Sequence, residues 1–149
     1  MRSFSAAVAI RAPKERVWPI LINAAGYPEW NPIIDHMEGA IEPGAHLRVF
    51  TKNQPKRAFP VTVEHFSPPN KMVWRGGLPL KAFTGTRTFL LRSLKDGSVE
   101  FEMREVYSGW LAGWIRKLMP DLQGDFERFA VALKRHAESL EPVASTLER

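Results

Sequence analysis

Hydrophobic and polar positions alternate with a period of two over much of the chain, and this pattern predicts strands. The first such segment, 3–11, places Phe4, Ala6, Val8 and Ile10 on one face. Gly, Pro, Asn and Asp residues interrupt the alternation at short intervals, which indicates hairpin turns and an antiparallel meander. From Ile33 onward, further strands are expected at 33–40, 46–53, 58–67, 71–77, 82–93 and 98–107.

Two short segments after the first strand have helical rather than strand character. Pro13 and Glu15 are typical of a first helical turn, and Val17 and Trp18 begin an apolar face behind them. Pro19 cannot donate to a carbonyl four residues back, so this helix is expected to be short or kinked. A second short helix or turn is expected over 23–31.

The segment Trp110–Leu140 predicts one long amphipathic helix whose two halves differ. The rear half has the single apolar stripe that docks a helix on a core: Leu122, Phe126, Phe129, Ala130, Leu133 and Ala137. The front half has more large apolar groups than such a stripe needs: Trp110, Leu111, Trp114, Ile115, Leu118 and Met119. We expect the front half to line a ligand-binding hollow, to contact a membrane or to meet a second subunit. A bend at Pro120 would let it move as a lid.

These elements predict an α+β fold with a single domain over residues 1–140 and a flexible tail at 141–149. Seven antiparallel strands form a curved sheet that wraps around the long C-terminal helix, and two short helices follow the first strand. A meander of this length twists strongly, and only the last helix is long enough to cover its concave face.

Composition narrows the classes of function. The chain has 149 residues, 44% of them hydrophobic and 25% charged, which is typical of a soluble globular protein. The net charge of +5 is scattered, so we expect no nucleic-acid partner. There is no cysteine and no apolar run of membrane-spanning length, which favours a cytoplasmic location. The four histidines lack ligand spacing, so neither a metal site nor a cofactor is expected.

One turn predicts a charged pair on the apolar face of the sheet. Lys95-Asp96-Gly97 suits a three-residue hairpin loop with Gly in the left-handed position. Pairing outward from this loop sets Arg87 opposite Glu105, in line with Phe89 opposite Met103 and Leu91 opposite Phe101. Two opposed charges on an apolar face should pair, because an isolated buried charge is very costly. The pair is either structural or a polar anchor for the oxygen of a ligand.

The order of elements, together with several short motifs, resembles the SRPBCC superfamily, which includes START-like and polyketide cyclase/dehydrase-like proteins. The resemblance covers residues 3 to 140 and implies a helix-grip fold with a deep apolar cavity between the sheet and the last helix. The motifs that carry it are Ala12-Pro13-x-Glu15-x-Val17-Trp18, Tyr27-Pro28-Glu29-Trp30-Asn31-Pro32, Gly39 with Gly44, Val73-Trp74, Gly85-x-Arg87-x-Phe89 and Glu105-x-Tyr107-x-Gly109.

Three functions are compatible with these residues. The first is a soluble binding or carrier protein for a small hydrophobic ligand, lipid-like, isoprenoid or aromatic. The second is a cyclase- or dehydratase-like enzyme that uses Glu105, Tyr107 and Arg87. The third is a peripheral membrane or partner-binding module that uses the front of the last helix. The expected ligand-binding residues are Tyr27, Trp30, Trp74, Arg87, Phe89, Phe101, Met103, Glu105, Tyr107, Trp110, Trp114 and Leu118.

Overall fold

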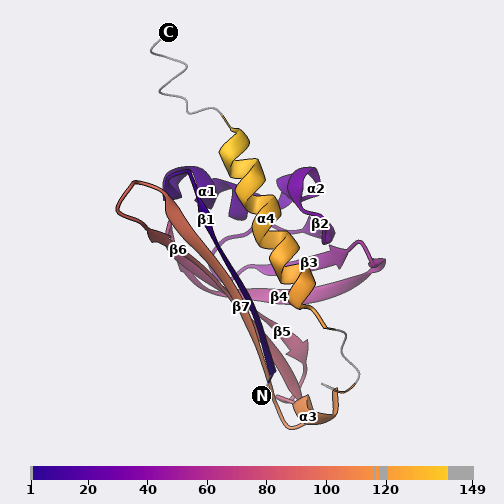
Figure 1. The fold of residues 1–149 in the computed structure, drawn as a ribbon. Coiled ribbons are helices and arrows are strands. Elements are labelled where there is room, and N and C mark those ends of the chain that lie inside the picture. The colour runs from indigo at the N-terminus through magenta and orange to yellow at the C-terminus, as the bar shows by residue number, and fades with distance from the viewer. Residues whose placement is uncertain (1, 116, 118–120, 141–149) are drawn as a thin grey trace.

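The computed structural model describes residues 2–115, 117 and 121–140. It shows a curved antiparallel sheet with a C-terminal helix, α4 (Gln123–Ser139), lying across its concave face (Figure 1). This arrangement confirms the predicted α+β class. The expected tail at 141–149 lies outside the described residues.

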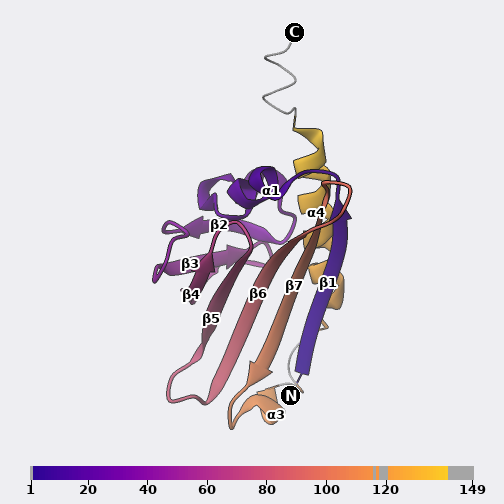
Figure 2. The ribbon, with the colours of Figure 1, turned by 90° about the vertical axis from the view of Figure 1, so that its left-hand side faces the viewer.

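Seven strands form one sheet in the order β1-β7-β6-β5-β4-β3-β2. The strands β2 to β7 each pair with the next strand in the sequence, whereas β1 pairs with β7. Figure 2 shows the strands from β2 to β7 following one another as hairpins, with β1 on the outer edge beside β7. The strands are β1 (Arg2–Ile10), β2 (Ile34–Glu38), β3 (His46–Thr51), β4 (Gln54–Ser67), β5 (Lys71–Leu78), β6 (Phe83–Ser93) and β7 (Val99–Ser108).

Two hairpin turns show how local sequence sets strand register. The β6–β7 loop has the predicted geometry, because Leu94 N–H donates to Ser98 O at 2.9 Å and Gly97 has a φ of +87°. The turn between β3 and β4 differs from the prediction. Thr51 pairs with Gln54, so the turn is a tight two-residue one and Pro55 lies within β4.

Short helices close one end of the sheet. They are α1 (Lys14–Leu21), the 3-10 helix η1 (Ala24–Gly26) and α2 (Tyr27–Trp30). Pro19 lies inside α1, which ends two residues later, as expected for a residue that cannot continue the hydrogen-bond ladder. Trp18 is buried and packs edge-on against Phe66, with ring centroids 5.6 Å apart.

The core is one cluster that extends from α4 and β1 across the concave face to the strands at the other side of the sheet and to α1. Phe129, at the middle of α4, is buried against four aromatic rings, those of Tyr27, Trp30, Phe89 and Phe101. The rear-half stripe predicted for the last helix is the buried face of α4. At the C-terminal end of α4, Glu138 accepts from the backbone N–H of Arg11 at 2.8 Å, which ties the helix to the end of β1.

The prediction of one continuous helix from 110 to 140 is wrong. The described residues contain a four-residue helix, α3 (Ala112–Ile115), and then α4, which begins anew at Gln123. Asp121 Oδ1 accepts from Gln123 N–H at 2.9 Å and so satisfies a free amide at the start of α4. Leu118 and Pro120 lie outside the described residues, as does the predicted bend. Within the described ranges, no helix combines the length and apolar character needed to span a membrane.

Candidate functional site

A charged pair with a tyrosine lies on the concave face where α4 begins. Arg87 on β6 pairs directly with Glu105 on β7, and Arg87 Nε donates to Glu105 Oε1 at 2.7 Å. Tyr107, two residues along the same face of β7, donates its hydroxyl to Glu105 Oε2. The hydrogen bond predicted from the register of the hairpin is therefore present, and both oxygens of Glu105 are engaged.

This polar cluster is only partly withdrawn from solvent. The side chains of Arg87 and Glu105 retain 23% and 14% of their exposure. Burial lowers the pKa of Arg87, but the charge and hydrogen bond of Glu105 raise it by more, so the guanidinium stays charged. The guanidinium carbon also lies 4.9 Å from the ring centre of Phe126, in the first turn of α4. One face of Arg87 is thus covered by the helix.

Trp74 on β5 is the other neighbour of Arg87, because the two residues are directly opposed across β5 and β6. The indole is 3% exposed and packs on Phe89 with a centroid distance of 4.8 Å. Within the described part of the chain, its Nε1–H has no hydrogen-bond partner. A buried N–H without a partner costs about 1–3 kcal/mol, so it is a donor that an incoming oxygen would satisfy.

Beyond the cluster, the concave face continues as a half-buried apolar surface, which we call the concave floor. Val61, Gly76, Gly85 and Tyr107 form one cross-strand row over β4 to β7, so they share a face. A side chain at Gly85 would meet the Tyr107 ring at 3.2 Å, which shows that this ring lies over the glycine. Three further side chains complete the floor: Phe59, Leu78 and Phe83.

α4 leaves the outer part of the floor uncovered, whereas Tyr107 at its inner edge is buried. Phe59 and Leu78 are 38% and 49% exposed, whereas Phe89 and Phe101, further along the same face, are fully buried beneath α4. Most contacts of α4 with the sheet are with β1, at one edge, and fewer are with β7 (Figure 1). The apolar floor and the polar cluster therefore lie side by side at the uncovered end of the sheet.

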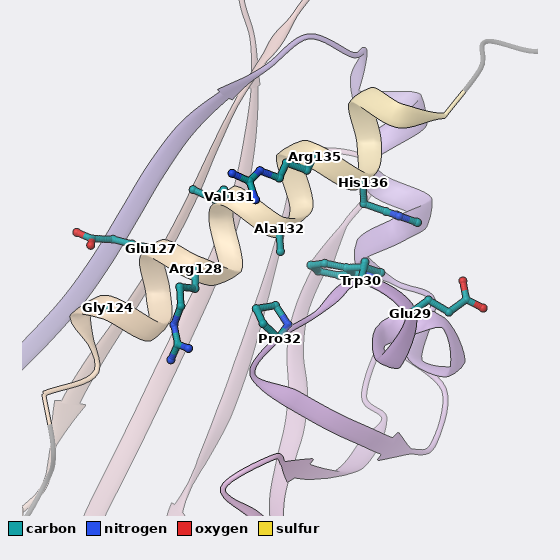
Figure 3. Close-up of a pocket in the computed structure, with 10 residues that line it drawn as sticks. All are labelled: Glu29, Trp30, Pro32, Gly124, Glu127, Arg128, Val131, Ala132, Arg135 and His136. Carbon is teal, nitrogen blue, oxygen red and sulfur yellow. The ribbon is translucent and has the colours of Figure 1, made fainter.

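A separate open groove of about 880 Å³ lies on the outer side of α4. Figure 3 shows Trp30 and Pro32 facing the helix across it, with Val131 and Ala132 on the helix side. Its remaining lining is largely charged or polar: Glu29, Glu127, Arg128, Arg135 and His136. Sites for apolar ligands are mostly apolar with few polar groups, so the concave floor is the better candidate.

The structure brings together some of the predicted site residues and separates others. Arg87, Glu105, Tyr107 and Trp74 are adjacent, as described above. Phe89, Phe101 and Met103 are fully buried in the core under α4. Tyr27 is also buried there, and its hydroxyl donates to Leu21 O at 2.7 Å, while burial raises its pKa well above the usual range and Arg87 lowers it in part.

The remaining predicted residues lie elsewhere. Trp30 stacks on His136 beside the outer groove, with centroids 6.2 Å apart. Trp110 and Trp114 are 72% and 65% exposed at the far end of the sheet, and Leu118 is outside the described residues. The sequence prediction omitted the floor residues of β4 and β5, although their alternation with polar positions placed them on the same face as Trp74.

Comparison with known proteins supports the fold. Solved structures that resemble the chain include a hypothetical protein from Helicobacter pylori, with a TM-score of 0.73 at 14% identity over 91% of this chain and 88% of that one. A START superfamily protein from Mycobacterium smegmatis has a TM-score of 0.70 at 19% identity, covering 93% of this chain and 99% of that one. DynU16, described as a putative protein in the dynemicin biosynthetic locus, has a TM-score of 0.68 at 16% identity, covering 92% of this chain and 47% of that one.

No curated protein sequence matches the chain. A family model does match, over residues 1–138, and it is described as polyketide cyclase / dehydrase and lipid transport. The match covers nearly the whole chain and agrees with the curled seven-stranded sheet and its C-terminal helix. The chain therefore belongs to the polyketide cyclase / dehydrase and lipid transport family, of SRPBCC type, and has its helix-grip-like fold.

Proposed function

We propose that the protein binds a small, largely apolar molecule that carries a carbonyl or hydroxyl oxygen. The apolar body of the ligand lies on the concave floor, and its oxygen lies at the cluster of Arg87, Glu105 and Tyr107. One observation carries this proposal: a partly exposed charged pair borders an apolar surface that the last helix leaves uncovered. The family description and the fold are consistent with it.

The geometry supports holding a ligand more directly than transforming it. Arg87 and Tyr107 engage both oxygens of Glu105, so a proton taken from a ligand would compete with two hydrogen bonds that the carboxylate already accepts. The guanidinium of Arg87 has five N–H donors, and one of them is used on Glu105, so others remain for a ligand oxygen.

Paired ligands test the proposal. We expect the protein to bind 1-naphthol about tenfold or more tightly than naphthalene, because a net hydrogen bond to a charged group contributes about 1.5–3 kcal/mol. The double substitution Arg87→Met with Glu105→Leu should bring the two affinities close together while keeping the apolar contact. The matched control is Arg48→Met with Glu38→Leu, a pair that is also directly opposed across strands but exposed on β3 and β2.

Fluorescence titration of the three proteins, wild type and both double variants, with each of the two ligands gives a clear decision. Preference for 1-naphthol that survives in the Arg87 and Glu105 double variant would exclude the cluster as the anchor. Equal loss of preference in the control pair would exclude it as well. Weak binding of both ligands by the wild type, with none co-purifying in native mass spectrometry, would contradict binding on the floor.

A cyclase- or dehydratase-like activity is the second candidate, and the hydrogen bond between Tyr107 and Glu105 is the observation that favours it. Such a pair can pass a proton between a hydroxyl and a carboxylate near an apolar ligand. Glu105→Gln keeps the side chain's shape and distinguishes the two functions. Loss of water from a synthetic poly-β-ketone thioester, followed by mass spectrometry, should disappear in this variant if the protein is a catalyst. Binding of 1-naphthol should persist in either case.

A further inference from the structure

Large apolar side chains project into solvent at the end of the sheet opposite the β6–β7 loop. Leu80, in the turn between β5 and β6, is 88% exposed, and Trp110, just after β7, is 72% exposed. Leu78 and Trp114 are 49% and 65% exposed. They lie at the same end of the sheet, where α3 is found (Figures 1 and 2). We call these four residues the apolar tip.

Backbone contacts join the two segments of the tip into one unit. Leu111 N–H donates to Ala82 O at 2.7 Å, and Trp110 Nε1–H donates to Leu80 O at 3.4 Å. Gly109 has a φ of +113°, and a Cβ there would lie 2.6 Å from Ala82 O, so the two segments approach as closely as a glycine allows. The exposed side chains are therefore presented by backbone that is already fixed.

The two segments that carry the tip have charges of one sign. The sequence has no Asp or Glu at 76–95 or at 106–120, whereas Lys81 and Lys117 are exposed beside the apolar side chains. Trp and Leu flanked by Lys is the pattern of surfaces that enter the interface of a bilayer, with the rings among the headgroups and the cations near lipid phosphates. A protein partner would have to be acidic to match this surface.

We infer that the apolar tip docks the protein on an anionic lipid bilayer. This inference goes beyond ligand binding and does not require it, since Leu80 and Trp110 belong neither to the polar cluster nor to the concave floor, although Leu78 is shared with the floor. The two regions are nevertheless neighbours. Phe83, which follows the β5–β6 turn, stacks on Tyr107 with centroids 5.5 Å apart. A molecule that left the bilayer at the tip would meet the concave floor first.

Vesicle co-sedimentation of the full chain tests the inference. We expect binding to vesicles of phosphatidylglycerol and phosphatidylcholine in equal parts, weaker binding to phosphatidylcholine alone, and release as salt is raised. Leu80→Ser with Trp110→Ser should lower the partition coefficient by at least about tenfold, because two apolar side chains that would enter the bilayer are lost. Lys81→Ala should lower it about fivefold.

The β6–β7 loop supplies a matched control, because Leu94 and Lys95 repeat the Leu-Lys pair of the tip at the opposite end of the sheet. Leu94→Ser and Lys95→Ala should leave vesicle binding unchanged. Circular dichroism checks that the Leu80→Ser, Trp110→Ser variant is folded. We expect it to be, because both side chains are exposed and contribute little to the core.

Several outcomes would overturn the inference. They are absence of binding to the anionic vesicles, equal binding to neutral vesicles, or equal loss in the variants of Leu94 and Lys95. A dimer in sedimentation velocity that the Leu80 and Trp110 variant converts to a monomer, without vesicle binding by either, would assign the tip to a second copy of the chain.

Discussion

Replacing Glu105 with Ala should destabilise the protein by about 3 kcal/mol, whereas replacing Arg87 and Glu105 together with Met and Leu should cost less than about 1 kcal/mol. The single change leaves a charged guanidinium on an apolar face without its partner. The double change removes both charges and places apolar side chains of similar size beside Phe126 and Trp74.

The magnitude follows from exposure. Breaking a fully buried ion pair costs about 3–5 kcal/mol. Arg87 keeps 23% of its side-chain exposure and can recover some hydration, which moves the expected cost to the lower end of that range. The expected cost of Glu105→Ala is therefore about 3 kcal/mol.

Urea unfolding of the wild type, Arg87→Met, Glu105→Leu and the double variant completes a double-mutant cycle, and Glu105→Ala is measured beside it. For a chain of this size, 3 kcal/mol corresponds to a fall in Tm of about 6–12 °C. The exposed pair of Arg48 and Glu38 is the control, and its double substitution should change stability by less than about 0.5 kcal/mol. A double variant of Arg87 and Glu105 that is as unstable as Glu105→Ala would refute the reasoning, because the loss would then come from shape rather than from an unpaired charge.

Three other substitutions have definite expectations. Phe129→Ala should cost about 3–5 kcal/mol in urea unfolding, because it removes the ring on which four aromatic side chains converge. Glu138→Gln should cost about 1 kcal/mol near pH 7. A backbone N–H and a lysine lower the pKa of Glu138 in the folded protein, so its contribution is present above the unfolded pKa of about 4.3 and disappears as pH falls through the folded pKa. Gly109→Ala should lower Tm more than Gly97→Ala, because both have positive φ but only at Gly109 would the new Cβ meet backbone, the carbonyl of Ala82.

Each expectation has an outcome that contradicts it. A loss below about 1 kcal/mol for Phe129→Ala would mean that the surrounding rings close the space left by the side chain. A difference in the free energy of unfolding between Glu138→Gln and wild type that stays constant from neutral to acid pH would show that ionisation of the carboxylate is not its cause. Equal Tm values for the two glycine variants would show that φ alone, and not contact with the β5–β6 turn, determines the cost.

The sequence predicted the sheet and the charged pair because both depend on local rules. Side chains alternate with a period of two, and Gly97 fixes the length of its loop, so the partners of Arg87 and Phe89 follow by counting along β6 and β7. The burial of the pair could be predicted because its neighbours on that face are apolar.

The division of residues 110–140 could not be predicted in this way. A helical period describes Trp110 and Trp114 equally well whether they continue a long helix or belong to a separate turn. The start of the separate turn is tied to the β5–β6 turn by a hydrogen bond from Leu111 to Ala82, two residues far apart in sequence. The uncovered floor depends on where α4 crosses the sheet, and that position follows from packing against β1.

The pairing of β1 with β7 also determines the order in which the chain can fold. Strands β2 to β7 each find a partner through a short turn, but β1 must wait for a strand that begins at Val99. Closing such a long loop costs entropy that no local contact offsets beforehand, so this step should come late and should limit the folding rate. Since α4 packs on β1, the core beneath the last helix can form only after the first strand has joined the sheet. Folding of this chain should therefore be nearly all-or-none, with both ends of the domain ordered in the same final step.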